Sequence, residues 1–141
     1  MAQASGGAGR GQMVSGWVGM VVFGGTVMII TGLFQGLAGL VGIFNDQYFL
    51  VGSEELVVSV SYTAWGWAHL VLGVVLLLTG FGILAGQTWA RVTGVVLAGI
   101  SSLVNIAFLA AHPVWSTLII ALDILVIYAL VAHGREMADT R

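Results

Sequence analysis

Residues 116–130 read STLIIALDILVIYAL, a run of apolar helix formers that a single carboxylate, Asp123, interrupts. No basic residue lies within this run. A helix needs about 20 apolar residues to cross the hydrocarbon core of a bilayer, and residues 114–132 supply a segment of that kind. The stretch therefore indicates a membrane span, and it raises the question of what a carboxylate does inside one.

The composition of the whole chain agrees with this interpretation. Of its 141 residues, 59% are hydrophobic and 7% are charged, and the mean hydropathy is +1.06. These values exclude an ordinary water-soluble domain. The chain has no cysteine, which excludes disulfides and thiolate chemistry. It also has no lysine and only four arginines, too few for a nucleic-acid surface.

Four apolar segments are long enough to cross a membrane. They cover residues of about 17–44, 64–85, 91–111 and 114–132. We therefore predict an all-α integral membrane protein, a four-helix antiparallel bundle over residues 17–133. The small, polar residues 1–16 and the segment 134–141 are expected to form tails, the first of them disordered.

The arginines predict the orientation in the membrane. With four spans, both termini share one side, and all four arginines fall on that side: Arg10, Arg91, Arg135 and Arg141. The positive-inside rule makes that side cytoplasmic, so we expect a multi-pass protein of the plasma membrane. Between the first two spans, GSEE supplies a turn and VVSVSY alternates apolar and polar residues. This outer loop predicts either a short β-hairpin or an irregular interfacial loop.

Small residues recur along the first three spans at helical spacing. Lipid tails give helices no hydrophobic reason to associate, so close packing of small residues has to hold such a bundle together. We predict helix contacts at Gly25, Gly32, Gly36, Gly39, Gly66, Gly73, Gly80, Gly94 and Ala98. Ser101 and Ser102 continue the stripe of the third span.

The polar residues of the spans share these stripes. Gln35, His69 and Asn105 each lie three, four or seven residues from a stripe position, so they should point into the bundle. Asp123 should also turn inward, because a carboxylate that faces lipid costs about 2.5 kcal/mol or more. With a rise of about 1.5 Å per residue, Gln35 and Asp123 come out near the midplane and the other two about one turn further out. We predict one intramembrane polar cluster of Gln35, His69, Asn105 and Asp123.

This cluster has two possible roles. Its hydrogen bonds can fix the register of the helices, at about 0.6–2 kcal/mol each. Alternatively, Asp123 and His69 can form a proton or cation relay, or the polar end of a small-ligand pocket. The chain contains no HExxH motif, no serine with a nearby base and no paired catalytic carboxylates. We therefore expect no enzyme activity, no metal site and no cofactor.

Several short motifs resemble a family of small four-helix membrane proteins that is common in actinobacteria and has no assigned function. They are FND, AWGW.H, GQTWAR, N..FL, P.WS and LD.LVIYAL, and the resemblance extends over residues 17–133. It implies a fold, a topology and an actinobacterial plasma membrane, but no activity. The matched motifs contain Asn45, Asp46, His69, Arg91, Asn105 and Asp123.

The sequence thus predicts a non-catalytic membrane protein, because packing surfaces abound and catalytic motifs are absent. Besides the lipid bilayer, its expected partner is another membrane protein or a further copy of itself, as an accessory subunit of a larger complex or as a homo-oligomer. The alternative is a small module that conducts protons, ions or a ligand through the cluster around Asp123 and His69.

Overall fold

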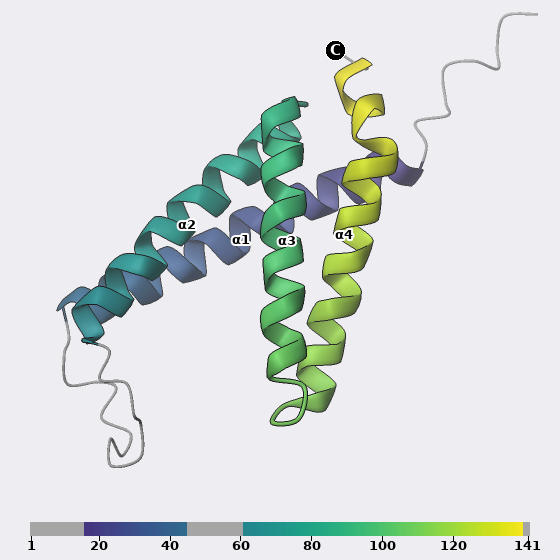
Figure 1. The fold of residues 1–141 in the computed structure, drawn as a ribbon. Coiled ribbons are helices and arrows are strands. Elements are labelled where there is room, and N and C mark those ends of the chain that lie inside the picture. The colour runs from purple at the N-terminus through teal and green to yellow at the C-terminus, as the bar shows by residue number, and fades with distance from the viewer. Residues whose placement is uncertain (1–15, 45–60, 140–141) are drawn as a thin grey trace, which may run out of the picture.

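Residues 16–44 and 61–139 are described by a computed structural model, and they form four helices and no strand (Figure 1). The helices are α1 (Gly16–Phe44), α2 (Tyr62–Leu84), α3 (Thr88–Ala107) and α4 (Pro113–Asp139). Each of them is long and apolar enough to cross a membrane. The predicted all-α class with four membrane helices is confirmed.

Two helices, α3 and α4, differ from the predicted spans by more than two residues. α3 starts at Thr88 and ends at Ala107, where 91–111 was expected, and α4 continues to Asp139 through most of the predicted tail 134–141. Hydropathy marks where the chain leaves the hydrocarbon core, whereas backbone hydrogen bonds decide where a helix ends. The predicted disordered tail lies outside the described residues except for Gly16, which starts α1. The predicted outer hairpin lies outside them except for its last two residues, Ser61 and Tyr62, which cap and begin α2.

The helix ends follow from local chemistry. Ser61 caps α2, since its hydroxyl oxygen accepts a hydrogen bond from the backbone N–H of Ala64 at 3.3 Å. α4 begins with Pro113, whose missing N–H costs nothing in the first turn of a helix. Between α2 and α3, Gly86 has a φ of 71°, and its N–H bonds to the carbonyl of Ile83. The N–H of Gln87 bonds to the carbonyl of Gly82, which completes a Schellman turn that requires glycine.

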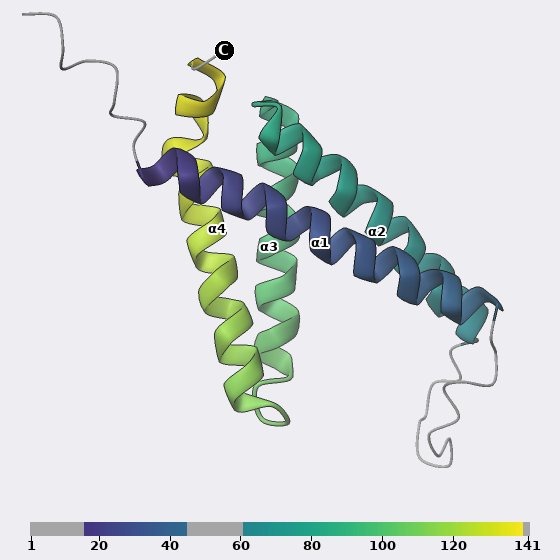
Figure 2. The same ribbon diagram turned by 180° about the vertical axis from the view of Figure 1, so that it is seen from behind.

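The helices form two antiparallel pairs, α1 with α2 and α3 with α4. The pairs meet at the end of the molecule that holds the α2–α3 turn and the start of α1, and they diverge toward the other end (Figures 1 and 2). The hydrophobic core lies at the convergent end, where Val21, Met28, Ile83, Ala90 and Leu130 are buried together. The molecule is therefore an open wedge, and the four axes do not run alongside one another for their full length.

Helix length explains part of this shape. α1 has 29 residues, and at about 1.5 Å per residue it is about 43 Å long. Such a helix is longer than a hydrocarbon core of about 30 Å, and tilting is one way in which it can be accommodated. α3 has 20 residues and matches the core without tilt. Because α2 stays packed on α1, the first pair leans away from the second.

Candidate functional site

Glycines bring α1 and α2 into backbone contact along their length. Antiparallel partners meet at three levels, Gly25 with Gly80, Gly32 with Gly73, and Gly39 with Gly66. A Cβ atom at Gly32 would lie 2.9 Å from the carbonyl oxygen of Gly73, and one at Gly66 would lie 2.8 Å from that of Gly39. At the Gly32–Gly73 and Gly39–Gly66 levels a Cβ would come within 3.0 Å of partner backbone, so these glycines fix how closely the two helices approach.

The remaining predicted packing positions differ among themselves. A Cβ at Gly36 would meet nothing within 4 Å. The backbone of Gly36 nevertheless lies against Gly73, where an added Cβ would meet it. A Cβ at Gly94 would meet the side chains of Leu130, Ile83 and Met28 at 3.0–3.2 Å, and Ala98 is buried. The stripe of α3 thus packs against side chains, whereas the stripe of α1 packs against backbone.

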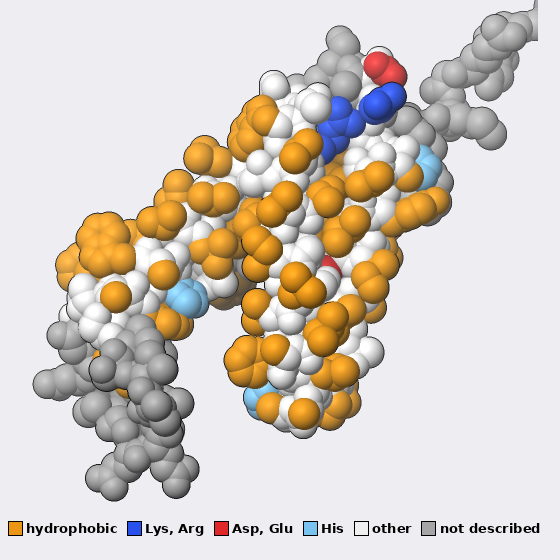
Figure 3. Space-filling view, in the orientation of Figure 1, with side chains coloured by type: hydrophobic (Ala, Val, Ile, Leu, Met, Phe, Trp, Pro, Cys, Tyr) orange, Lys and Arg blue, Asp and Glu red, His pale blue; other side chains and the backbone are white. Residues whose placement is uncertain are grey.

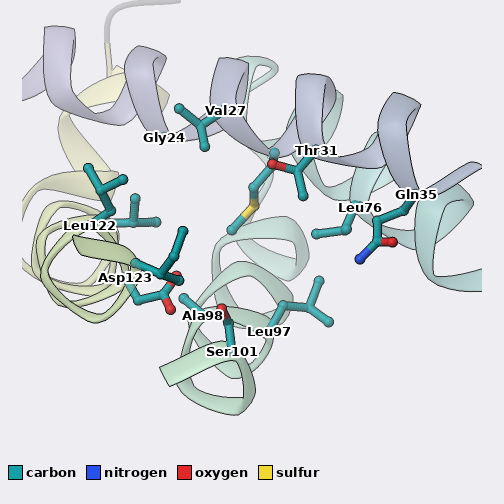
Figure 4. A pocket seen from close by; sticks show the side chains of 13 residues that line it. Gly24, Val27, Thr31, Gln35, Leu76, Leu97, Ala98, Ser101, Leu122 and Asp123 are labelled. Carbon is teal, nitrogen blue, oxygen red and sulfur yellow. The ribbon is translucent and has the colours of Figure 1, made fainter. Parts of the chain in front are cut away.

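A pocket lies between α1 and the α3–α4 pair, near the point where the wedge opens. Its volume is about 220 Å³. Most of its lining is apolar, with Leu76 and Leu97 among the side chains drawn in Figure 4. Four side chains in the lining are polar: Thr31, Gln35, Ser101 and Asp123. An apolar pocket with a few polar groups in its lining is the usual form of a small-molecule site.

Asp123 is held by α3. The Ser102 hydroxyl donates a hydrogen bond to its Oδ2 at 3.3 Å, and Ser101 lies beside the same carboxyl group in the pocket (Figure 4). No basic side chain is among the described residues that line the pocket. Asp123 is half-buried, so the serines cover only part of its carboxyl group.

The structure does not bring the four predicted cluster residues together. Gln35 lines the same pocket as Asp123, but from α1 across the cavity (Figure 4). His69 is 2.9 Å through Nδ1 from the carbonyl oxygen of Trp65, and it stacks on the Trp65 ring with centroids 3.7 Å apart. Asn105 donates through Nδ2 to the carbonyl of Ser101 at 3.0 Å. Neither His69 nor Asn105 lines the pocket.

The separation has a physical cause. The predicted cluster depends on four upright helices, in which residues at equal distances from the ends of their spans lie at equal depths in the membrane. Because the α1–α2 pair leans away, the N-terminal part of α2 that carries His69 lies far from α4 (Figures 1 and 2). His69 through Nδ1 and Asn105 through Nδ2 instead bond to carbonyl oxygens of their own helices.

Sequence reasoning did not assign two residues that contact Asp123 to the candidate site. Ser101 and Ser102 were assigned to packing, because small residues on a stripe usually serve that purpose. The sequence does contain a signal for this contact, since both serines are predicted to lie at the level of Asp123 on the neighbouring antiparallel helix. Among the described residues, no three His, Asp or Glu side chains gather as a possible metal site.

A family model described as a domain of unknown function, DUF7144, matches residues 20–135. The chain belongs to the DUF7144 family. The match includes the glycine contacts of α1 and α2 as well as Asp123 and its serines, so this geometry lies in the DUF7144 domain itself. The resemblance to a family without an assigned function is confirmed. No curated protein and no solved structure matches the chain significantly.

Proposed function

We propose that this DUF7144 protein is a non-catalytic, multi-pass protein of the plasma membrane that acts by associating with another membrane protein or with further copies of itself. Both termini face the cytoplasm in this proposal, as the positions of the arginines favour. An actinobacterial membrane is supported by the sequence motifs alone. One observation carries the proposal: Asp123 is half-exposed, in the middle of α4.

The exposure of this carboxyl group calls for a partner. The many apolar side chains on the outside of the helices need none, because they can face lipid. A carboxyl group that faces lipid at the centre of a span costs about 2.5 kcal/mol or more. The Ser102 hydroxyl relieves part of that cost. A helix of a partner, packed over the mouth of the pocket with a polar side chain directed toward Asp123, would cover the rest and supply a further hydrogen-bond donor.

Two substitutions of Asp123 test the proposal. In Asp123→Leu the polar group is lost, whereas in Asp123→Asn a neutral group of the same shape keeps its hydrogen-bonding capacity. We expect Asp123→Leu to weaken association about tenfold or more and Asp123→Asn to weaken it far less. Counting photobleaching steps of the labelled protein in bilayers gives its copy number, and blue native electrophoresis of solubilised membranes gives the size of any mixed complex.

A stable wild-type monomer that joins no complex in its native membrane would contradict this function. If the leucine and asparagine variants associate equally well, the polar group of Asp123 does not contribute to association. Circular dichroism and thermal unfolding of both variants show whether a loss of association is instead a loss of folding.

The pocket supports a second candidate function. Asp123, Gln35 and Thr31 line one cavity at mid-span, as the polar end of a route for protons, an ion or a small ligand would require. His69, the other member of the predicted relay, is not in that lining. Proton flux in proteoliposomes separates the two functions. Conduction predicts a flux that Asp123→Asn abolishes, whereas association predicts no flux in either protein and an assembly that depends on Asp123.

A further inference from the structure

A second hollow lies on the outside of the α3–α4 pair, at the convergent end of the wedge. It is an open groove of about 330 Å³. Its lining comprises Thr88, Arg91, Val92, Val95 and Val96 from α3 and Leu130, Val131 and Arg135 from α4. The basic side chains gather at this end of the two helices, and hydrophobic side chains follow below them (Figure 3). The groove is thus cationic at one end and apolar along the rest.

One hydrogen bond and one packing contact hold the Arg91 side chain at the charged end of the groove. Its Nη2 donates to the Thr88 hydroxyl at 3.0 Å, and its side chain packs against Gly134. Its Nε is buried and has no hydrogen-bond partner among the described residues. The buried Nε is out of reach of a ligand, but the guanidinium group as a whole lines the groove and brings its positive charge there.

The charges around Arg91 favour an anion. Arg135 reaches the same groove from α4 and is exposed. The described residues that line the groove include no acidic one. Asp139, which ends α4 one turn after Arg135, lies outside that lining. The N-cap residue of α3, Gln87, makes no side-chain capping bond, so the positive end of this helix adds to the two arginines.

We propose that this groove binds an anionic phospholipid. Arg91 and Arg135 hold the phosphate, because guanidinium groups match phosphate oxygens in charge and geometry. One acyl chain lies along Val92, Val96 and Val131, which continue the groove from its charged end into the span. A free phosphate ion would use only the cationic end, so the apolar remainder points to a lipid. Basic pockets between helices at the membrane surface suit this ligand.

This site is independent of the proposed association. It lies on the outside of α3 and α4, and it shares no lining residue with the pocket around Asp123. A protein that does not associate can still bind the lipid, and a protein that does not bind the lipid can still associate. The lipid site depends only on the helices spanning a membrane.

The first test compares two lipids on the wild-type protein. The purified full chain in detergent is titrated with phosphatidylglycerol or with phosphatidylcholine of the same acyl chains, and bound lipid is counted by native mass spectrometry. Each arginine is expected to contribute about fivefold in affinity, so phosphatidylglycerol should bind about 25-fold more tightly. Equal binding of the two lipids overturns the site, as does displacement of phosphatidylglycerol by millimolar inorganic phosphate.

Charge variants form the second test. Arg91→Gln and Arg135→Gln should each weaken phosphatidylglycerol binding about fivefold and weaken phosphatidylcholine binding less, because the choline cation offsets the charge of its phosphate. Arg10→Gln removes the same charge from another segment of the chain and should keep the preference for the anionic lipid. The site is wrong if Arg10→Gln has an equal effect, or if the Arg91→Gln/Arg135→Gln double variant binds phosphatidylglycerol like the wild type. The wild-type comparison stands even where a variant fails to fold.

Discussion

At the scale of the residue, the hydrogen bond between Ser102 and Asp123 joins α3 to the middle part of α4. Other side-chain bonds in the spans serve a different purpose. Thr26, Thr93 and Thr117 each donate to a carbonyl one turn earlier on their own helix, which satisfies a hydroxyl group without linking two helices. A bond between helices contributes to tertiary stability, and a bond within one helix hardly does.

This difference predicts the effect of removing Ser102. We expect Ser102→Ala to lower the free energy of unfolding by about 0.6–2 kcal/mol, the usual contribution of a hydrogen bond between membrane helices. Thr117→Ala is the control, because its exposed hydroxyl bonds to the carbonyl of Pro113 on the same helix. Steric-trap unfolding in bicelles measures both. Equal losses in the two variants would mean that the Ser102–Asp123 bond adds no tertiary stability.

Sequence reasoning at this scale identified Asp123 and Gln35, which line one pocket, but it assigned them neighbours that the structure places elsewhere. Helical periodicity gives the direction of a side chain from its own axis. It does not say whether the nearest acceptor belongs to another helix. His69 and Asn105 found their acceptors one turn back, at Trp65 and Ser101, and such local bonds compete at every polar position of a helix.

At the scale of the element, the contact between α1 and α2 depends on which side of each glycine faces the partner. Gly32 and Gly36 look equivalent in the sequence, as the two ends of a GxxxG step. In the structure, a Cβ at Gly32 would lie 2.9 Å from both the carbonyl oxygen of Gly73 and the backbone nitrogen of Leu77. A Cβ at Gly36 would meet nothing within 4 Å.

Alanine substitutions separate these two glycines. Gly32→Ala should force the helices apart and destabilise the protein by about 1–3 kcal/mol, as overpacking at a close contact does. Gly36→Ala should change the stability by less than about 0.5 kcal/mol, as substitutions without new contacts do. The same unfolding assay in bicelles compares the two variants. A larger loss in Gly36→Ala than in Gly32→Ala would mean that α1 presents a different face to α2.

Helix existence was readable from the sequence because the bilayer sets the length of the apolar run that a span needs. The positions of the helix ends were harder to predict from the sequence. α4 continues to Asp139 because the residues after the span can still form backbone hydrogen bonds in the headgroup region and in water. Gly86 is the exception, since glycine between two apolar runs marks the left-handed turn that ends α2.

At the scale of the whole molecule, the wedge was not predictable from residue patterns. Both helix pairs contain stripes of small residues, which indicate contacts but name no partner. The tilt of a pair depends on packing against its neighbours and on the mismatch between helix length and bilayer. The glycines let α1 and α2 touch along their length, while buried side chains tie them to the other pair at the convergent end alone. The Asp123 pocket is a consequence of that divergence.

The two helix pairs also fix which parts of the chain share a side of the membrane. Gln87 and Asp139 lie at the convergent end with Arg91 and Arg135, and Ser61 and Ala111 lie at the divergent end. The positive-inside rule makes the arginine end cytoplasmic. Because the chain has no cysteine, thiols introduced singly can report these sides without background. In intact cells, an impermeant maleimide should label Ser61→Cys and Ala111→Cys and spare Gln87→Cys and Asp139→Cys; inverted vesicles should show the opposite. A complete reversal would contradict the cytoplasmic termini, and labelling of all four from one side would contradict the spans themselves.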